Sequence, residues 1–182
     1  GYCYVNPGFQ REAVQDIKRC IDDFGFIGVK LYNEYKVWDP AVRPVLETCL
    51  ELDIPILHHA GHPWRPLPGQ PFISDAADMG RVVQQYPELK LIYGHIWGGG
   101  DWEWTLRALR DAPGLHADTS GSVVDEGGIE KAVQMLGADR LLFACDMSMT
   151  AGVGKVLAAD ISDEDREAIF SGNMRRLLGG RV

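Results

Sequence analysis

Features that would assign a function directly are missing from this 182-residue sequence. No apolar run approaches the roughly 18 residues that a membrane-spanning helix needs, so we expect a soluble protein with no membrane partner. Lysine and arginine form no cluster and the formal net charge is −8, which argues against nucleic acid as a partner. No apolar run is followed by a GxGxxG or Walker-type loop, so nucleotide binding is not expected.

The cysteines also exclude one class of protein. Cys3, Cys20, Cys49 and Cys145 are far apart in the sequence and include no CxxC pair. This spacing is typical of thiols in a reducing compartment, and not of a disulfide framework or a zinc knuckle. We therefore expect a cytoplasmic protein.

Short apolar runs alternate with longer helical patterns along the whole chain. The runs are too short for helices and are rich in β-branched, aromatic and leucine residues, which favours buried parallel strands. They occupy residues 2–5, 26–31, 54–57, 89–93, 115–117 and 141–145. Their first residues are 24 to 35 positions apart, the spacing that repeated βα units produce.

Several segments between the runs carry an apolar stripe with the helical period. These stripes lie within residues 14–24, 42–50, 79–86 and 129–136. Pro44 should occupy the first turn of its helix, where its missing N–H costs least. Ser162, followed by Asp165, predicts a capped start for the last helical stretch, and Gly172 with Asn173 predicts a break within it.

Residues 60–74 form the longest insertion and contain four prolines, at positions 63, 66, 68 and 71. We expect a stiff, irregular loop directly after a strand. In a barrel, loops in that position lie on the face where active sites are built.

The length leaves two fold alternatives within the α/β class. A complete (β/α)8 barrel takes about 250 residues, so 182 residues hold about six of its eight units, and six strands are expected. The six parallel strands form either an open, doubly wound sheet or an incomplete (β/α)8 TIM barrel. No linker or low-complexity tract divides residues 1–182, so we expect a single domain.

Histidines and an aspartate follow several of the predicted strands. His58, His59, His62 and His95 lie at or just after strand ends, and Asp146 ends another strand. Side chains at the carboxyl ends of neighbouring parallel strands converge on one mouth of a barrel. Imidazole and carboxylate groups suit a divalent ion such as Zn²⁺, which lowers the pKa of bound water to about 7.

The sequence resembles the amidohydrolase-2 branch of the amidohydrolase superfamily, which are metal-dependent hydrolases and decarboxylases built on a (β/α)8 barrel. The resemblance runs through the whole chain. Its segments are residues 4–7 (YVNP), 25–31 (GFIGVKL), 54–61 (IPILHHAG), 93–97 (YGHIW), 117–120 (ADTS), 142–146 (LFACD) and 172–178 (GNMRRLL), which are similar to the third to eighth strands and the closing helix of the family.

The resemblance implies a role for each strand-end residue. His59 corresponds to the metal-binding histidine of the fifth strand, and His95 to the histidine that polarises the substrate or moves protons. Asp146 corresponds to the aspartate that binds the metal and activates water. The metal is expected to be Zn²⁺, with Mn²⁺ as the alternative, and the substrate a small organic acid, lactone or amide.

Four further residues are expected to shape the substrate pocket. Trp97 and Trp64 would form its aromatic walls, and Arg65 and Lys30 would attract an anionic substrate. Packing is the alternative for the two tryptophans. The alternative for Arg65 is a solvated side chain on the loop. The alternative for Lys30 is a side chain that extends its ammonium out to solvent.

Two departures from the family pattern matter. The sequence has no His-x-His pair, which the family carries on its first strand, and the first recognisable strand is similar to the third. We therefore expect the first two βα units to be missing from this chain, and the chain alone to bind metal weakly or not at all. Secondly, Met147, Ser148 and Met149 follow Asp146, where the family usually has proline.

The open sheet edges that this predicts would favour association, so we expect a homo-oligomer that binds a small-molecule substrate. The alternative to an enzyme is a non-catalytic partial α/β barrel that assembles with a partner and binds no metal.

Overall fold

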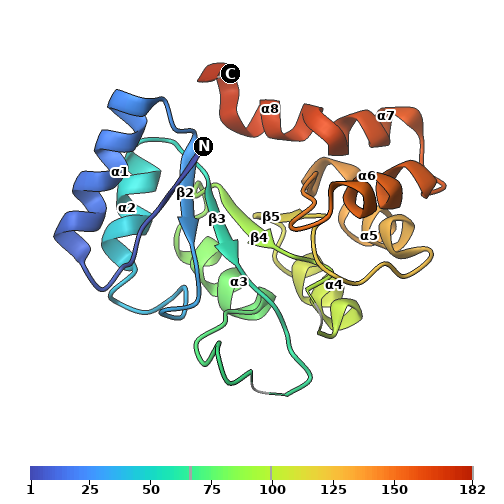
Figure 1. Cartoon of the computed structure of the whole chain (residues 1–182), viewed down its shortest axis with the longest axis horizontal. Coiled ribbons are helices and arrows are strands. Elements are labelled where there is room, and N and C mark those ends of the chain that lie inside the picture. The colour runs from blue at the N-terminus through green and yellow to red at the C-terminus, as the bar shows by residue number, and fades with distance from the viewer. Residues whose placement is uncertain (66, 99, 182) are drawn as a thin grey trace.

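The computed structural model describes residues 1–65, 67–98 and 100–181. Pro66, which the sequence places in the proline-rich loop, lies outside the described residues. Six strands alternate with helices along the chain (Figure 1). The strands are β1 (Tyr2–Tyr4), β2 (Gly28–Leu31), β3 (Ile56–His59), β4 (Leu91–Gly94), β5 (Leu115–Asp118) and β6 (Leu141–Leu142).

The helices connect successive strands and then close the chain. They are α1 (Gln10–Phe24), α2 (Arg43–Glu51), α3 (Ala76–Gln85), α4 (Trp102–Arg110), α5 (Gly128–Leu136), α6 (Met149–Ala158), α7 (Asp163–Glu167) and α8 (Asn173–Leu178), with short turns η1 (Ala138–Arg140), η2 (Ala168–Gly172) and η3 (Gly179–Arg181). None of the described helices combines the length and apolarity needed to span a bilayer.

All six strands are parallel and lie in the order β1-β2-β3-β4-β5-β6. A doubly wound sheet reverses its strand order at a switch point, whereas a barrel adds each strand beside the previous one. The helices follow the same order, since α1 packs on α2, α3 on α4, and α4 on α5. The observed order therefore confirms the incomplete barrel of six βα units and excludes the doubly wound alternative.

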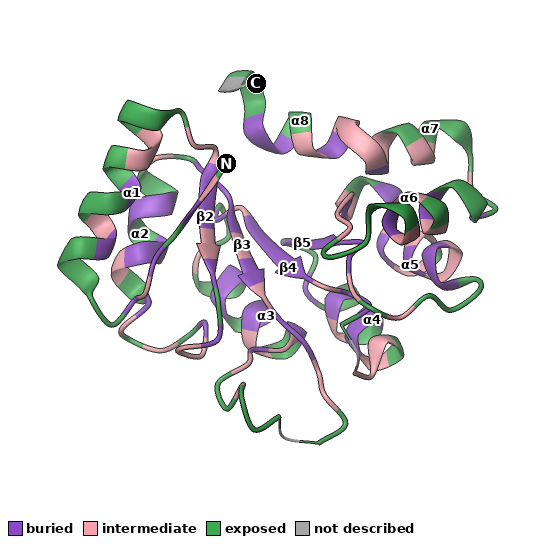
Figure 2. Cartoon of the chain, in the orientation of Figure 1, coloured by how far each residue is buried: buried purple, intermediate pink, exposed green. Residues whose placement is uncertain are grey.

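The two faces of the sheet differ in burial, because successive side chains of a strand point in opposite directions. One face packs under α1 to α5 and is apolar, as Val29, Ile56 and Leu91 show with at most 1% of each residue exposed. The opposite face, here called the inner face, carries a row of register partners. This row consists of Tyr4, Lys30, Leu57, Ile92 and His116. In Figure 2, the strands and the sheet-facing sides of the helices are the most buried parts.

Helix α8 covers the inner face near the strand starts. Leu177 packs with Ile92 and Leu142 in a small buried cluster, and Met174 packs against it. The Tyr2 hydroxyl lies 3.9 Å from the Met174 sulfur, so α8 also reaches the first strand. Figure 1 shows α8 at one end of the molecule and the long 60–74 loop at the opposite end.

All six predicted strands are confirmed, and so is Pro44 in the first turn of α2. The predicted break at Gly172 and Asn173 is wrong. Both residues have helical backbone angles, with φ and ψ of −58° and −44° for Gly172, and the π-helical turn η2 leads directly into α8. Asn173 does not interrupt the helix because its buried side chain donates to the carbonyls of Ala138 and Leu141, both at 2.6 Å.

Helices α4 and α6 were not predicted from the sequence. Helix α6 contains Gly152 and Gly154, which disfavour helices in isolation. A Cβ atom on Gly152 would lie 2.6 Å from the Cβ of Cys145, so glycine lets α6 pack closely on the chain after β6. Tertiary packing therefore decides the structure of this segment.

Candidate active site

The strand-end residues singled out in the sequence line one cavity. His59 ends β3, His95 follows β4, and Asp146 lies four residues beyond β6. All three line a cavity of about 150 Å³, together with Gln70 and other residues of the 60–74 loop. The structure therefore brings together an imidazole pair and a carboxylate at the carboxyl ends of the strands, as predicted.

An unusual backbone conformation is shared by His95 and Asp146. Their φ angles are +72° and +52°, in the left-handed region that residues with a side chain rarely adopt. Such conformations cost about 1–3 kcal/mol each and concentrate at functional sites. At each of these two residues the backbone turns away from the direction of the preceding strand, and the side chain lines the cavity.

A glycine allows β4 to approach β3 at this point. Gly94 is the register partner of His59, and a Cβ atom on Gly94 would lie 2.7 Å from the carbonyl oxygen of His58. Only glycine fits this close approach without displacing the backbone of β3. The Gly94-His95 pair thus combines close strand packing with the left-handed turn that follows.

His59 is held between two rings and one amide. Its ring stacks on Tyr32 at 4.2 Å between centroids and meets His95 edge-on at 4.8 Å. The Nε2 atom lies 3.3 Å from the side-chain oxygen of Gln70. Burial, aided by the nearby His95, lowers the pKa of His59 to about 4, so the ring is neutral at pH 7.

His95 is oriented by a relay that ends at Asp118. The Ser120 hydroxyl donates to the Asp118 carboxylate at 2.5 Å, so its oxygen is left to accept from His95 Nδ1 at 2.7 Å. This places a proton on Nδ1 of His95, while Nε2 has no partner among the described residues. Asp118 also accepts from the backbone N–H of His95 at 2.9 Å, which fixes the backbone of the same residue.

The base of the 60–74 loop is anchored on both sides. Gly61 N–H donates to the Ser74 carbonyl at 3.0 Å, and His62 Nδ1 lies 3.2 Å from the Asp75 carboxylate. The Lys36 ammonium donates to the Ile73 carbonyl at 2.6 Å. These contacts fix the two ends of the loop. Gln70, between those ends, lines the cavity.

The four predicted substrate-binding residues lie outside this cavity. Lys30 lies half-buried on the inner face; burial lowers its pKa, and the carboxylates of Asp118 and Asp146 oppose that shift. Trp97 is only 2% exposed and lines a different cavity. Trp64 is 76% exposed, and Arg65 is exposed beside it on the loop.

Sequence reasoning missed three residues of the site. Tyr32 directly follows β2, so the rule that found His95 would also have found it. Ser120 follows Asp118 by two residues, and its pairing with His95 could not be read from the spacing. Gln70 reaches His59 only through the loop conformation, for which the sequence holds no signal.

The donor set fits part of a metal site. A neutral imidazole and a carboxylate are the ionisation states in which these groups ligate divalent ions. His59 and Asp146 supply one of each in the same cavity. The described residues hold no group of three His, Cys, Asp or Glu side chains placed to bind an ion. His59 and Asp146 thus fit two positions of a site, and a catalytic metal normally takes three protein ligands.

Comparison with known proteins identifies a matching family profile and several relatives. A profile of the amidohydrolase family, Amidohydro_2, matches residues 2–180. The chain is 26% identical over 220 residues to gamma-resorcylate decarboxylase of Rhizobium radiobacter, covering 93% of this chain and 67% of the relative. It is 25% identical over 208 residues to 2-keto-4-carboxy-3-hexenedioate hydratase of Sphingobium sp., covering 91% of this chain and 60% of that relative. The chain thus spans about two thirds or less of the length of these relatives.

A solved structure has the same fold. Dihydroxybenzoic acid decarboxylase from Polaromonas sp. JS666, with bound manganese and the inhibitor 2-nitroresorcinol, matches with a TM-score of 0.69 and 20% identity. The match covers 93% of this chain and 65% of that chain. At this identity the likeness establishes the shared fold alone.

Proposed function

This chain belongs to the amidohydrolase family, and from that premise we propose that it forms the active-site part of a metal-dependent decarboxylase of small carboxylic acids. The similar proteins named above are a decarboxylase and a hydratase, which favours decarboxylation over the hydrolysis considered from the sequence. The observation that carries the proposal is the single cavity lined by His59, His95 and Asp146.

His59 and Asp146 would hold the ion, either Zn²⁺ or Mn²⁺, with further ligands from outside this donor pair. When bound, a divalent ion supplies positive charge that stabilises a carboxylate or phenolate of the substrate. Manganese in the Polaromonas decarboxylase supports Mn²⁺ as a candidate alongside Zn²⁺. Tyr32 and Gln70 would keep the His59 ring in place, through stacking and through the contact at Nε2.

Decarboxylation breaks the bond between the carboxyl carbon and its neighbour. Carbon dioxide leaves, and the electron pair that remains on the neighbouring carbon takes up a proton. His95 and Asp146 both line the cavity and are the candidates to hold that proton. The relay through Ser120 leaves Nε2 of His95 as the atom that would accept or deliver it.

Lys30 would contribute charge to the same reaction. It lies on the inner face below the cavity mouth, and the carboxylates of Asp118 and Asp146 act on its pKa. A half-buried ammonium there would attract an anionic substrate and oppose the negative charge of the two carboxylates. Trp64, Arg65 and Trp97 have no part in this proposal, because the first two are exposed on the loop and Trp97 lines another cavity.

The test is a paired metal and activity measurement. Elemental analysis after incubation with Mn²⁺ or Zn²⁺, followed by release of carbon dioxide from gamma-resorcylate, should be run on this chain. The same measurements should be run on a longer form in which a preceding segment adds a His-x-His pair. We expect metal and activity in the longer form, and a loss of activity by orders of magnitude in Asp146→Asn.

Asparagine is the matched replacement because it tolerates the left-handed backbone of Asp146, so the variant should fold normally. Wild-type turnover in Asp146→Asn would remove this residue from the mechanism. Absence of metal and activity in both forms would favour the alternative, a non-catalytic partial barrel that assembles with a partner.

A further inference from the structure

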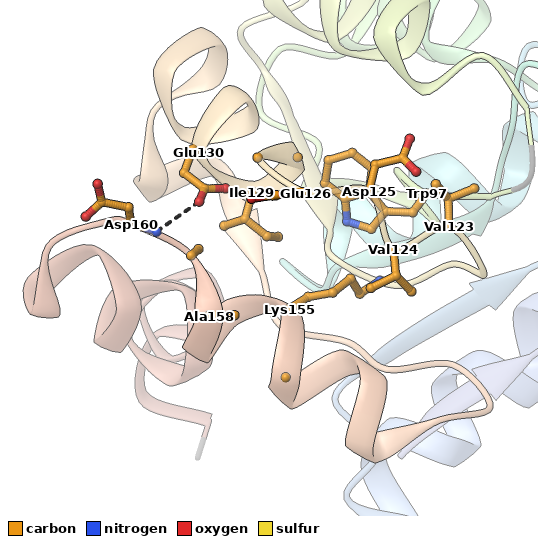
Figure 3. Close-up of a pocket in the computed structure, with 14 residues that line it drawn as sticks. Trp97, Val123, Val124, Asp125, Glu126, Ile129, Glu130, Lys155, Ala158 and Asp160 are labelled. Atoms are coloured by element: carbon orange, nitrogen blue, oxygen red, sulfur yellow. Dashed lines mark hydrogen bonds between the residues drawn. The ribbon is translucent and has the colours of Figure 1, made fainter.

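A second cavity is separate from the candidate active site. It has a volume of about 570 Å³ and lies between the β5–α5 connection, the first turn of α5, and α6 (Figure 3). Its lining has no residue in common with that of the His59 cavity. Ligand sites typically have volumes of 300–1,000 Å³, and the volume of this cavity falls within that range.

A buried donor in this cavity has no partner. Trp97 is 2% exposed, and its indole Nε1 has no hydrogen-bond acceptor among the described residues. A buried donor without an acceptor is unfavourable, so a ligand that accepts from it gains affinity. Figure 3 shows the edge of the indole that carries this nitrogen facing the side chain of Lys155.

Lys155 adds a positive charge to the same cavity. Its ammonium donates to the Gly121 carbonyl at 3.3 Å, and an ammonium carries two further hydrogens. The start of α5 lines the cavity as well, and no side chain caps its first turn. Free N–H groups at a helix start favour a negative charge nearby.

Two of the four carboxylates that line the cavity accept hydrogen bonds within the fold. Asp125 accepts from the indole N–H of Trp102 at 2.8 Å. Glu130 accepts from the backbone N–H of Asp160 at 2.9 Å, the contact drawn dashed in Figure 3. Beside these carboxylates, the cavity offers two donors, the indole N–H of Trp97 and the ammonium of Lys155. Its apolar lining consists of Val123, Val124, Ile129, Ala158 and Ala159.

We propose that this cavity is a second ligand site, which binds a small organic acid with its carboxylate on Lys155 and Trp97 Nε1 and its apolar body against Val123 and Ile129. An anion with one carboxylate and a compact apolar body satisfies both donors. It also avoids placing a second negative charge near Asp125 and Glu130. The proposal is independent of the decarboxylase assignment, because the two cavities share no lining residue.

The test is a titration with benzoate, followed by ¹H–¹⁵N spectra of the indole N–H groups of the unmodified chain. The Trp97 resonance is identified by its absence in Trp97→Phe. We expect benzoate to shift this resonance in a saturable way. Benzamide has the same shape without the charge, and it should bind at least tenfold more weakly.

Two variants separate this site from the rest of the molecule. Lys155→Met should weaken benzoate binding at least tenfold, while Lys18→Met, which removes an exposed lysine of α1, should leave it unchanged. Asp146→Asn should also leave the Trp97 shift unchanged, since Asp146 lines the other cavity. The proposal is overturned if benzoate does not move the Trp97 resonance, if Lys155→Met binds as well as wild type, or if benzamide binds equally.

Discussion

Asp118 controls the geometry of His95 although it lies outside the cavity. One carboxylate oxygen accepts three hydrogen bonds, from the backbone N–H groups of His95 and Ser120 and from the Ser120 hydroxyl. The residue is 4% exposed, so this oxygen is hardly reached by water. Asp118 thus fixes both the left-handed backbone and the ring tautomer of His95.

Removing the Asp118 carboxylate should therefore destabilise the fold and disturb the site together. We expect Asp118→Ala to lower the free energy of unfolding by about 3 kcal/mol, because buried hydrogen bonds to charged groups contribute about 1.5–3 kcal/mol. Urea unfolding measures this change. The exposed Asp111, whose carboxylate pairs with the adjacent Arg110, supplies the control Asp111→Ala, with an expected change below about 0.5 kcal/mol. Equal stability of the two variants would contradict this role for Asp118.

His116 should make stability depend on pH. Burial lowers its pKa, with the charges of Arg140 and Arg176 adding to the effect. The unfolded chain then binds a proton near pH 6.5 that the folded chain does not bind until lower pH, so stability falls as the pH falls below about 6.5. We expect His116→Gln to lose less unfolding free energy than wild type between pH 7.5 and 5.0, measured in urea. An equal loss in both proteins would show that His116 does not contribute.

Strand-end position and the family resemblance together located His59, His95 and Asp146 from the sequence, because parallel strands bring their carboxyl ends to one edge. The orientation of Trp97 could not be predicted, since it follows from the turn after His95. That turn buries the indole behind the site. Local strand patterns therefore predict which residues reach the mouth, while loop conformation decides which of them share a cavity.

At the scale of elements, the predicted strands were found because each is an isolated apolar run between polar segments. The C-terminal stretch was misjudged because Gly172 and Asn173 usually end helices. In this fold Asn173 is 1% exposed and satisfies two carbonyls of the η1–β6 segment. A long-range contact thus overrides the local preference, and sequence patterns do not report such contacts.

Asn173 should therefore be an anchor of α8. We expect Asn173→Ala to lower the free energy of unfolding by about 2–3 kcal/mol, because the carbonyl oxygens of Ala138 and Leu141 each lose a buried N–H donor. The neighbouring Arg175→Ala, on the exposed side of the same helix, is the control and should change stability by less than about 0.5 kcal/mol. Thermal or urea unfolding of wild type and both variants measures these changes. Comparable effects of the two substitutions would mean that Asn173 is not an anchor.

Asp75 joins the start of α3 to the active-site loop. Its carboxylate caps the helix by accepting from Asp78 N–H at 2.9 Å, and its other oxygen contacts His62. We expect Asp75→Ala to cost about 1–2 kcal/mol of stability and to raise the rate of proteolysis within residues 60–74. Asp75→Ser keeps a capping oxygen and should restore most of the stability, but not the protection of the loop. If the rate of proteolysis changes in neither variant, Asp75 does not stabilise the 60–74 loop.

At the scale of the whole molecule, the sheet is open. In the described part of the chain, β1 and β6 each have a single neighbouring strand. Unpaired strand edges are templates for pairing with other chains. This favours the predicted association between copies of the chain.

We expect sedimentation velocity to show self-association that increases over an about hundredfold range of concentration. Tyr4 lies on the β1 edge and is 56% exposed, so Tyr4→Lys should reduce the association, as lysines do on natural sheet edges. Phe24→Lys changes an equally exposed aromatic residue of α1 that lies off the edge, and should not. A monomer at every concentration would contradict association through the edges.

Helix α8 packs against the sheet near the strand starts, where Leu177 contacts Ile92 and Leu142. The cavity with His59, His95 and Asp146 lies at the opposite end of the strands. The residues of the α8 cluster differ from those that line the cavity, so substitutions at one end of the barrel need not affect the other. Libraries that randomise residues 67–73 and 122–126 should yield folded proteins with new preferences. The same diversity introduced around Leu177 should mostly yield unfolded chains.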